Sequence, residues 1–205
     1  MLPTLHEFAA SGNCYKIRLL LAHLGRPYAR VGHDITQGAT RTPEFLARVG
    51  PNGRIPVWEE DGRFLPESNA ILWRIAEGTD WLPGDAWERA DALRWLFWEQ
   101  YNHEPNIATL RFWIHYGGGI AARPAWQQAA VGAKRAMGEE ALALMEAHLG
   151  ARRWFVGARP SIADIALYAY THVADEGGFD LAPYAAVRAW LARVAALPGH
   201  VPIEA

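Results

Sequence analysis

Residues 52–57, Asn-Gly-Arg-Ile-Pro-Val, restrict the possible folds most, because Pro56 sets the backbone at the start of an expected strand. Proline has no N–H and pushes the residue before it into an extended conformation. The N–H and C=O of Ile55 can therefore pair with the main chain of an extended ligand, as a neighbouring strand would. We interpret Ile55 and Pro56 as an edge at which a small peptide docks. Arg54 before them either meets a terminal carboxylate of that peptide or is simply solvated.

An acidic and a hydroxyl residue follow this edge one hairpin later. The expected strands 57–59 and 63–65 are joined by a turn at Asp61 and Gly62, a pair typical of tight hairpins. Ser68 then falls at a helix start, where unpaired N–H groups and the helix dipole attract a carboxylate. Glu67 beside it can hold an ammonium group. These groups together describe a ligand with a backbone-like middle and an amino-acid head.

The first part of the chain alternates expected strands and helices. An apolar run with helical spacing stops at Gly25, and Pro43 suits the first turn of a brief helix. The expected elements are a strand at 2–7, a helix at 13–24, a strand at 28–34, a helix at 42–48, the hairpin, and a helix at 68–77. Their order predicts an α/β unit of the form βαβ–αββα.

The second part of the chain predicts helices only. Residues 78–85 interrupt the pattern with Gly and Pro and are interpreted as a linker between a first domain at 1–77 and a second at 86–205. Ser161 and Asp164 form an expected capping box, and a last helix is expected over 183–197. Apolar residues recur at helical spacing on two expected helices: Leu93, Leu96, Phe97 and Tyr101 on the first, and Ala133, Met137, Ala141, Leu144, Met145 and Leu149 on the second.

Composition excludes several classes of protein. The formal charge of −2 with interspersed signs offers no basic stripe for nucleic acid. No leader sequence and no apolar run long enough to cross a membrane is recognised, so a cytoplasmic protein without membrane partners is expected. The single cysteine cannot form an internal disulfide. The eight histidines lack the spacing of metal ligands, so no metal is expected.

The chain resembles the glutathione transferases. Residues 11–18, Ser-Gly-Asn-Cys-Tyr-Lys-Ile-Arg, open the first expected helix after a short strand, as the serine-containing catalytic loop of that family does. The resemblance implies an N-terminal thioredoxin-like domain with a cis-proline before its third strand, followed by an all-helical C-terminal domain. It also implies that glutathione is the co-substrate and is bound by Arg54, Ile55, Pro56, Glu67 and Ser68.

Three residues of this loop are candidates for activating the glutathione thiol. A Ser11 hydroxyl at the loop would donate to the sulfur and favour the thiolate, which is otherwise a small fraction at neutral pH. The Asn13 amide is the rival donor, although either residue can instead cap the helix. A catalytic Cys14 would indicate redox chemistry through a mixed disulfide with glutathione. We interpret Cys14 instead as a small buried apolar residue. Lys16 is interpreted as an exposed helix residue, with a carboxylate contact as the alternative.

A pocket for the second substrate is expected to be apolar and aromatic. The first helical hairpin carries more aromatic surface than a core needs, and the resemblance places the electrophile between this region and the Ser11 loop. His103 is either a substrate partner or a satisfied histidine of the core or surface. The candidate residues of this pocket are Ala9, Trp98, Tyr101, His103 and Trp113.

The sequence therefore predicts a homodimeric transferase that adds the thiolate of glutathione to a small electrophile. The aromatic residues near Trp87, Phe97, Trp113 and Trp126 are expected to supply the dimer face, and the alternative is that they fill a large helical core. Two alternatives stay open: a glutathione-dependent disulfide reductase or peroxidase, and a non-catalytic module that binds glutathione or an apolar compound.

Overall fold

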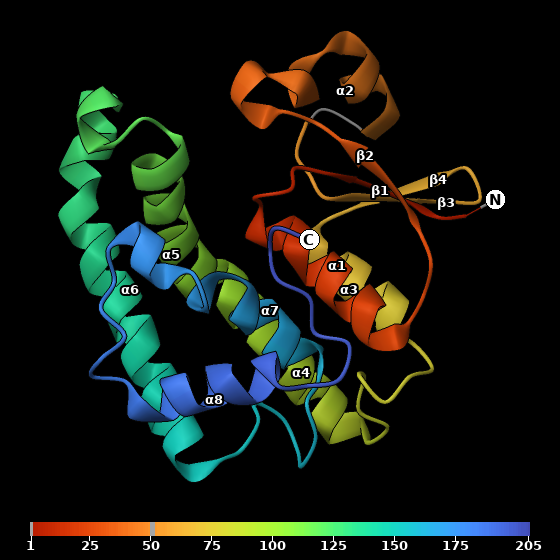
Figure 1. The fold of residues 1–205 in the computed structure, drawn as a ribbon, viewed down its shortest axis with the longest axis vertical. Helices are drawn as coiled ribbons and strands as arrows, with labels where there is room; N and C mark the ends of the chain where they lie inside the picture. Colours follow the sequence, from red (N-terminus) through yellow and green to blue (C-terminus); the bar gives the residue numbers. More distant parts are fainter. Residues whose placement is uncertain (1, 50–51) are drawn as a thin grey trace. The chain divides into compact units, whose positions relative to one another are not determined.

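The computed structural model describes residues 2–49 and 52–205, which fall into two compact units (Figure 1). The first unit extends to Thr79 and also includes Leu197–Ala205, and the second spans Asp80–Ala196. The sequence placed the tail 197–205 in the helical domain, but the structure assigns it to the first unit. The Tyr15 hydroxyl donates to the Val201 carbonyl at 2.6 Å, and the Ile203 side chain is buried. Long-range contacts of this kind have no signature in a local pattern.

One mixed sheet forms the first unit, with the strand order β2-β1-β3-β4. β1 runs parallel to β2 and antiparallel to β3, and β3 and β4 form the expected hairpin. Helices α1 and α3 lie side by side on one face of the sheet and α2 lies on the other (Figure 1). The elements are β1 (Thr4–Glu7), α1 (Gly12–Leu24), β2 (Ala29–Gly32), α2 (Pro43–Val49), β3 (Val57–Glu60), β4 (Arg63–Pro66) and α3 (Ser68–Ala76), with 3₁₀ turns at Ile35–Gln37 and Ala39–Arg41. This arrangement confirms the predicted thioredoxin-like fold.

Local signals explain where these elements begin and end. Ser11 caps α1, and Gly25 ends it in the left-handed conformation with φ 60°. The turn of the β3–β4 hairpin needs positive φ at both central residues, and Asp61 and Gly62 have φ 51° and 73°. The second expected strand reached residue 34, but β2 ends at Gly32. Asp34 instead caps a 3₁₀ turn by accepting from the Thr36 N–H at 2.9 Å.

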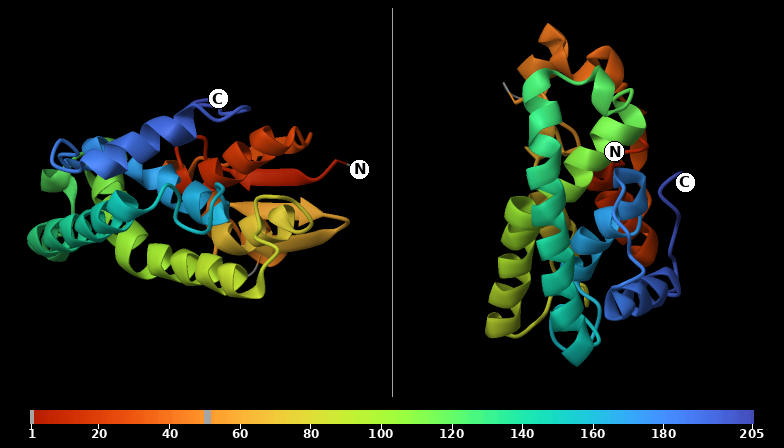
Figure 2. Two further views of the ribbon diagram at one scale, coloured as in Figure 1. Left: turned by 90° about the horizontal axis from the view of Figure 1, so that it is seen from below. Right: turned by 90° about the vertical axis from the view of Figure 1, so that its left-hand side faces the viewer.

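The second unit contains helices and no strand between Asp80 and Ala196, all of which are described. A continuous helical segment runs from α4 to residue 116 with two π-helical stretches, Glu99–His103 and Phe112–Tyr116. The first stretch precedes Pro105, which lacks the N–H that a regular turn would use. Helix α6 packs along α5 and against α8 (Figure 2). The helices are α4 (Ala86–Trp98), α5 (Glu104–Arg111), α6 (Ala125–Ala151), α7 (Ile162–Thr171) and α8 (Ala185–Ala195).

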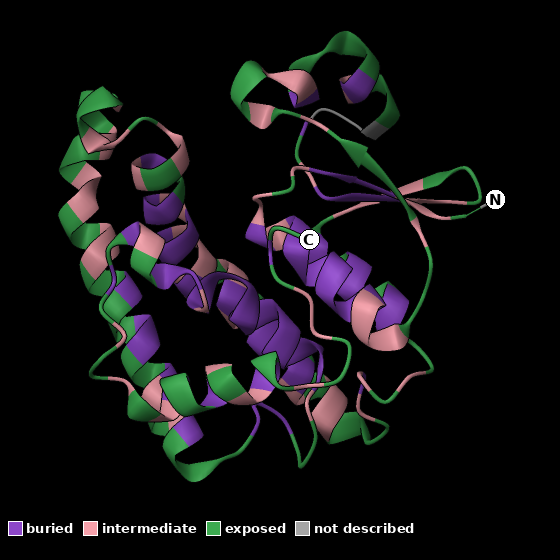
Figure 3. Ribbon diagram, viewed as in Figure 1, coloured by how far each residue is buried: buried purple, intermediate pink, exposed green. Residues whose placement is uncertain are grey.

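Burial in this unit differs from the apolar stripes that the sequence suggested. On α4 the core side chains are Ala92, Trp95 and Leu96, whereas Phe97 is 67% exposed. On α6, Met137 and Leu144 also face solvent. Helix α7 is buried along its whole length (Figure 3). Helical spacing identifies residues that share a face, but it does not say which of two apolar faces a neighbouring helix covers.

The predicted capping box at the start of α7 is confirmed. Asp164 is fully buried, and its carboxylate accepts from the Ser161 N–H at 2.9 Å and the Phe155 N–H at 3.2 Å. It also accepts from the Trp190 indole N–H at 3.0 Å, which ties α8 to α7. Burial raises the pKa of Asp164 to about 6, against the opposing effect of these donors. This carboxylate is therefore a structural junction of three segments.

Candidate functional site

The starts of α1 and α3 meet at a polar cluster that we call the helix-start cluster: Asn13, Lys16, Ser68 and Asn69. The Lys16 ammonium donates to the Ser68 hydroxyl at 3.3 Å and to the Asn69 side-chain oxygen at 3.2 Å. The Ser68 hydroxyl in turn donates to the Asn13 side-chain oxygen at 3.3 Å. The structure thus brings together Asn13 and Ser68, which the sequence singled out from segments 55 residues apart.

Lys16 differs from the sequence interpretation, which expected an exposed residue. Its side chain is fully buried, and Ser68 is 5% exposed. The signal for this burial is the spacing of Asn13 and Lys16, three residues apart on one helix face, with an apolar run after them. Asn69 was also missed as a partner, although it follows Ser68 directly.

Electrostatics make this cluster a place for an anion. Both helices direct the N–H groups of their first turns and the positive ends of their dipoles to their starts. The buried Lys16 adds a full positive charge beside them. A carboxylate docked at the start of α3 would gain from all three sources, and such helix starts are common anion sites.

Ser11 has the position of a helix cap and a side chain that is not fully covered. Its hydroxyl oxygen accepts from the Cys14 N–H at 3.4 Å. Capping uses the oxygen as an acceptor, so the hydroxyl hydrogen is not consumed by the cap. Ser11 can therefore cap α1 and still donate to a ligand atom, and its catalytic role stays a prediction.

Cys14 has the environment of a structural cysteine. Its side chain is fully buried, and burial raises the pKa of its thiol to about 12. A thiol with this pKa is protonated at neutral pH and is a poor nucleophile. These properties agree with the interpretation of Cys14 as a small buried apolar residue.

The edge before β3 has the cis-proline that the resemblance implied. The bond between Ile55 and Pro56 is cis, and Pro56 is buried. Within the part of the chain that the structure describes, no hydrogen bond involves the Ile55 main chain. Arg54 beside it is exposed, and Glu67 at the start of α3 is exposed with φ 72°. The Ile55 main chain is thus available to a ligand, and the glutathione contacts stay predictions.

The residues expected to line the second-substrate pocket have very different environments. His103 is fully buried, and its Nε2 lies 2.9 Å from the Thr171 hydroxyl on α7. Trp113 is 5% exposed and packs edge-on against Trp126. Tyr101, by contrast, is 81% exposed. Trp98 is half-buried against Trp95, and Ala9 is exposed in the first unit. Their contact with a substrate stays a prediction.

Two further features concern metals and membranes. Among the described residues, no group of three or more His, Cys, Asp or Glu side chains is arranged to hold a metal ion. Within the same ranges, no helix is both long enough and apolar enough to cross a membrane.

Comparisons with known proteins cover both units. The chain matches the N-terminal domain of glutathione S-transferase over residues 10–77 and the C-terminal domain over residues 123–193. The disulfide-bond oxidoreductase YfcG of Escherichia coli is 31% identical over 93% of this chain and 89% of its own length. A solved glutathione S-transferase from Pseudomonas fluorescens is 48% identical, with 99% of both chains covered and a TM-score of 0.92. A possible glutathione S-transferase from Rhodopseudomonas palustris is 44% identical, with 100% of this chain and 91% of that chain covered and a TM-score of 0.94.

Proposed function

Because this chain belongs to the glutathione S-transferase family, we propose that it binds glutathione on its first unit and activates the thiol for attack on a small electrophile. The observation that carries the proposal is the helix-start cluster, in which Lys16 and Ser68 join the starts of α1 and α3. This cluster suits the α-carboxylate of the γ-glutamyl group, while the Ile55 main chain suits the peptide-like middle of the ligand.

The reaction we propose needs the protein to favour the thiolate. A free thiol has a pKa of about 8.5, so only a few per cent is ionised at neutral pH. A hydroxyl or amide donor aimed at the sulfur, together with the start of α1, stabilises the charge. The thiolate then forms a bond to carbon of an apolar or aromatic electrophile. In a substitution the leaving group departs with its electron pair, and the thiol proton has passed to solvent.

Titration calorimetry with glutathione, followed by turnover of an aromatic halide, tests this function. We expect saturable binding of glutathione and release of halide that depends on it. Binding without turnover of any electrophile would favour the alternative of a binding module. Absence of glutathione binding would remove the proposal altogether.

Ser11→Ala is expected to lower turnover at neutral pH by about tenfold and to raise the pKa of the bound thiol by about one unit. Glutathione affinity should change only a few-fold, because the serine contacts sulfur and not the peptide. The thiolate absorbance of the complex, followed against pH, measures the shift. Asn13→Ala is the matched variant, and a shifted titration there with an unchanged one in Ser11→Ala would transfer the role to Asn13.

Ser68→Ala and Glu67→Gln are each expected to weaken glutathione binding by about 1–2 kcal/mol. Ser68 would lose a hydroxyl that faces the carboxylate, and Glu67 would lose the charge that holds the ammonium group. Calorimetry measures the affinity, and circular dichroism should show unchanged folding. Glu139→Gln, an exposed residue of α6, serves as the control. Parental affinity in both variants would contradict the assignment of the glutathione site.

A glutathione-dependent disulfide reductase is the second candidate, and the similarity to the Escherichia coli oxidoreductase favours it. In that reaction the thiolate of bound glutathione attacks a disulfide, forms a new S–S bond and expels the other sulfur as a thiolate. The buried Cys14, with its raised pKa, would take no part. Reduction of a small aliphatic disulfide by Cys14→Ala at the parental rate, with no turnover of halides, would establish this alternative.

A homodimer is also proposed, because large apolar side chains of the second unit face solvent. Trp87, Phe97 and Trp126 are 83%, 67% and 67% exposed, whereas Trp113 belongs to the core. Such side chains on a soluble protein commonly mark a partner surface. Light scattering at low micromolar concentration should report about twice the 22.8 kDa chain mass. In Phe97→Glu the measured mass should fall toward that of a single chain. A fully active monomer at that concentration would contradict the proposal.

A further inference from the structure

The loop between β1 and α1, which carries Ser11, is held by a buried arginine of the helix that follows it. Arg18 is 2% exposed, and its guanidinium group donates to the Ala9 carbonyl at 2.8 Å. Ala9 lies inside a tight turn in which the Ser11 N–H donates to the Phe8 carbonyl at 2.9 Å. The arginine therefore fixes the direction of a peptide group two residues before the serine.

The geometry of α1 explains how Arg18 reaches this loop. Helix residues about two turns apart lie on the same face, and long side chains lean back toward the helix start. Arg18 follows Ser11, the cap of α1, by seven residues. Its side chain therefore extends back along the face that leads to the loop.

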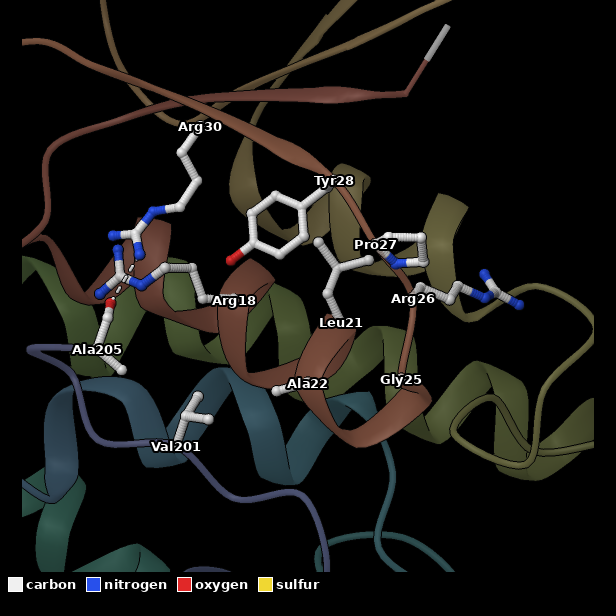
Figure 4. A pocket seen from close by; sticks show the side chains of 10 residues that line it. All are labelled: Arg18, Leu21, Ala22, Gly25, Arg26, Pro27, Tyr28, Arg30, Val201 and Ala205. Atoms are coloured by element: carbon white, nitrogen blue, oxygen red, sulfur yellow. Dashed lines mark hydrogen bonds between the residues drawn. The ribbon is translucent and has the colours of Figure 1, made fainter.

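The same guanidinium group is anchored at two further points. It binds one carboxylate oxygen of Glu7, the last residue of β1, and donates to the Ile203 carbonyl of the tail at 2.5 Å. Glu7 is itself 2% exposed and held by Arg30, which lies beside Arg18 (Figure 4) and binds the other carboxylate oxygen. A guanidinium group is planar and its donors have fixed directions. Its anchors at Glu7 and Ile203 therefore also set the direction from which it meets the loop.

The cap of α1, by contrast, holds Ser11 weakly. Its hydroxyl oxygen accepts from the Cys14 N–H at 3.4 Å, which is long for a bond of this kind. The position of the Ser11 hydroxyl therefore depends mainly on the backbone of the loop before it. Arg18 is the buried side chain that fixes this backbone at Ala9.

We propose that Arg18 is a positioning residue for activation of the thiol: by holding the loop at Ala9, it keeps the Ser11 hydroxyl where it donates to the glutathione sulfur. This inference rests on the proposed function, in which Ser11 is that donor. Arg18 contacts the loop, β1 and the tail, whereas glutathione docks at the helix-start cluster and at the Ile55 main chain. Loss of the contact should therefore impair activation of the thiol and leave docking almost unchanged.

Arg18→Lys tests this role, because it keeps a positive charge for Glu7 but has a single ammonium group that cannot reach all three acceptors. We expect the pKa of the bound thiol, followed by thiolate absorbance, to rise by about 0.5–1 unit. Turnover at about pH 6.5 should fall about three- to tenfold, while glutathione affinity stays within about twofold. Arg30→Met is the matched control, since Arg30 binds Glu7 and the Ala205 carbonyl rather than the loop, and it should keep the parental thiol pKa.

Hydrogen exchange of the loop amides is a second measurement, and it needs no glutathione. The Ser11 N–H should exchange at least about fivefold faster in Arg18→Lys than in the parent or in Arg30→Met, because the turn that holds it opens more often. If Arg18→Lys does not fold, Glu7→Gln, which loosens the anchor of Arg18, should show the same changes to a smaller extent.

Three results would overturn the role of Arg18. The first is a parental thiol pKa with parental loop exchange in Arg18→Lys, and the second is the same result in Glu7→Gln where Arg18→Lys does not fold. The third is an equal loss of turnover and of glutathione affinity, which a general loss of structure would produce. Failure of the parent protein to bind glutathione would instead overturn the proposed function, and the role of Arg18 in the reaction with it.

Discussion

Asp164→Ala is expected to lower the free energy of unfolding by about 3–5 kcal/mol. The carboxylate is the common acceptor for the Ser161 N–H, the Phe155 N–H and the Trp190 indole N–H, all of them buried. A buried donor left without an acceptor costs about 1–3 kcal/mol, and partial relaxation makes the sum smaller than three independent losses. The variant loses the Asp164 half of the capping box and the connection of α7 to α8, while the Ser161 side chain can still cap α7.

Urea unfolding followed by tryptophan fluorescence measures this loss. Asp85→Ala is the matched control, because Asp85 is the exposed N-cap of α4 and its carboxylate accepts the Glu88 N–H at 3.0 Å. We expect about 1 kcal/mol there, the usual cost of an exposed N-cap. Equal losses in the two variants would show that Asp164 acts as a cap alone and that its contact with Trp190 contributes nothing.

Lys16→Met is expected to weaken glutathione binding by about 2–3 kcal/mol, which is a loss of roughly 30- to 150-fold. A unit charge about 6 Å from a carboxylate contributes this much at the effective dielectric constant of a partly buried site. Lys16 reaches the proposed carboxylate position through Ser68, whose hydroxyl it contacts at 3.3 Å. The change removes charge while keeping most of the buried side-chain volume.

Calorimetry again gives the affinity, and the pH dependence of turnover separates docking from activation. The position of the thiol ionisation should stay near its parental value, because Lys16 is assigned to the carboxylate end of the ligand. Lys134→Met is the control, since Lys134 is the other lysine of the chain, donates to the Pro105 carbonyl and lies over the Trp113 ring in the second unit. Parental affinity in Lys16→Met would remove the cluster from the glutathione site.

Some of the candidate site followed from the sequence because single residues constrain their own backbone. Pro56 lacks an N–H and forces its neighbour to be extended, and the structure has the expected edge before β3. Ser68 starts α3 as predicted, two residues after the hairpin's second strand β4 ends at Pro66. The loop serine caps α1 for the same local reason.

The burial of other residues depended on which helix faces are covered by neighbouring segments of the fold. Lys16 and Phe97 are opposite cases: the lysine interpreted as exposed is fully buried, and the phenylalanine assigned to an apolar stripe is 67% exposed. The network of Glu7, Arg18 and Arg30 joins β1, α1 and β2, and no spacing in the chain links those three positions.

The sequence alone determined the order of the main strands and helices of the first unit, the turn of its hairpin and the capping box of α7. These features depend on backbone preferences that act over one to four residues, which a linear pattern records. The cis-proline and the family followed from the resemblance of several motifs in order along the chain. Only the tertiary structure decided that residues 197–205 join the first unit, that Lys16 lies beneath Ser68, and that Arg18 and Arg30 share Glu7. Those outcomes come from the packing of segments distant in the chain, where burial and charge are set by the neighbours that the fold supplies.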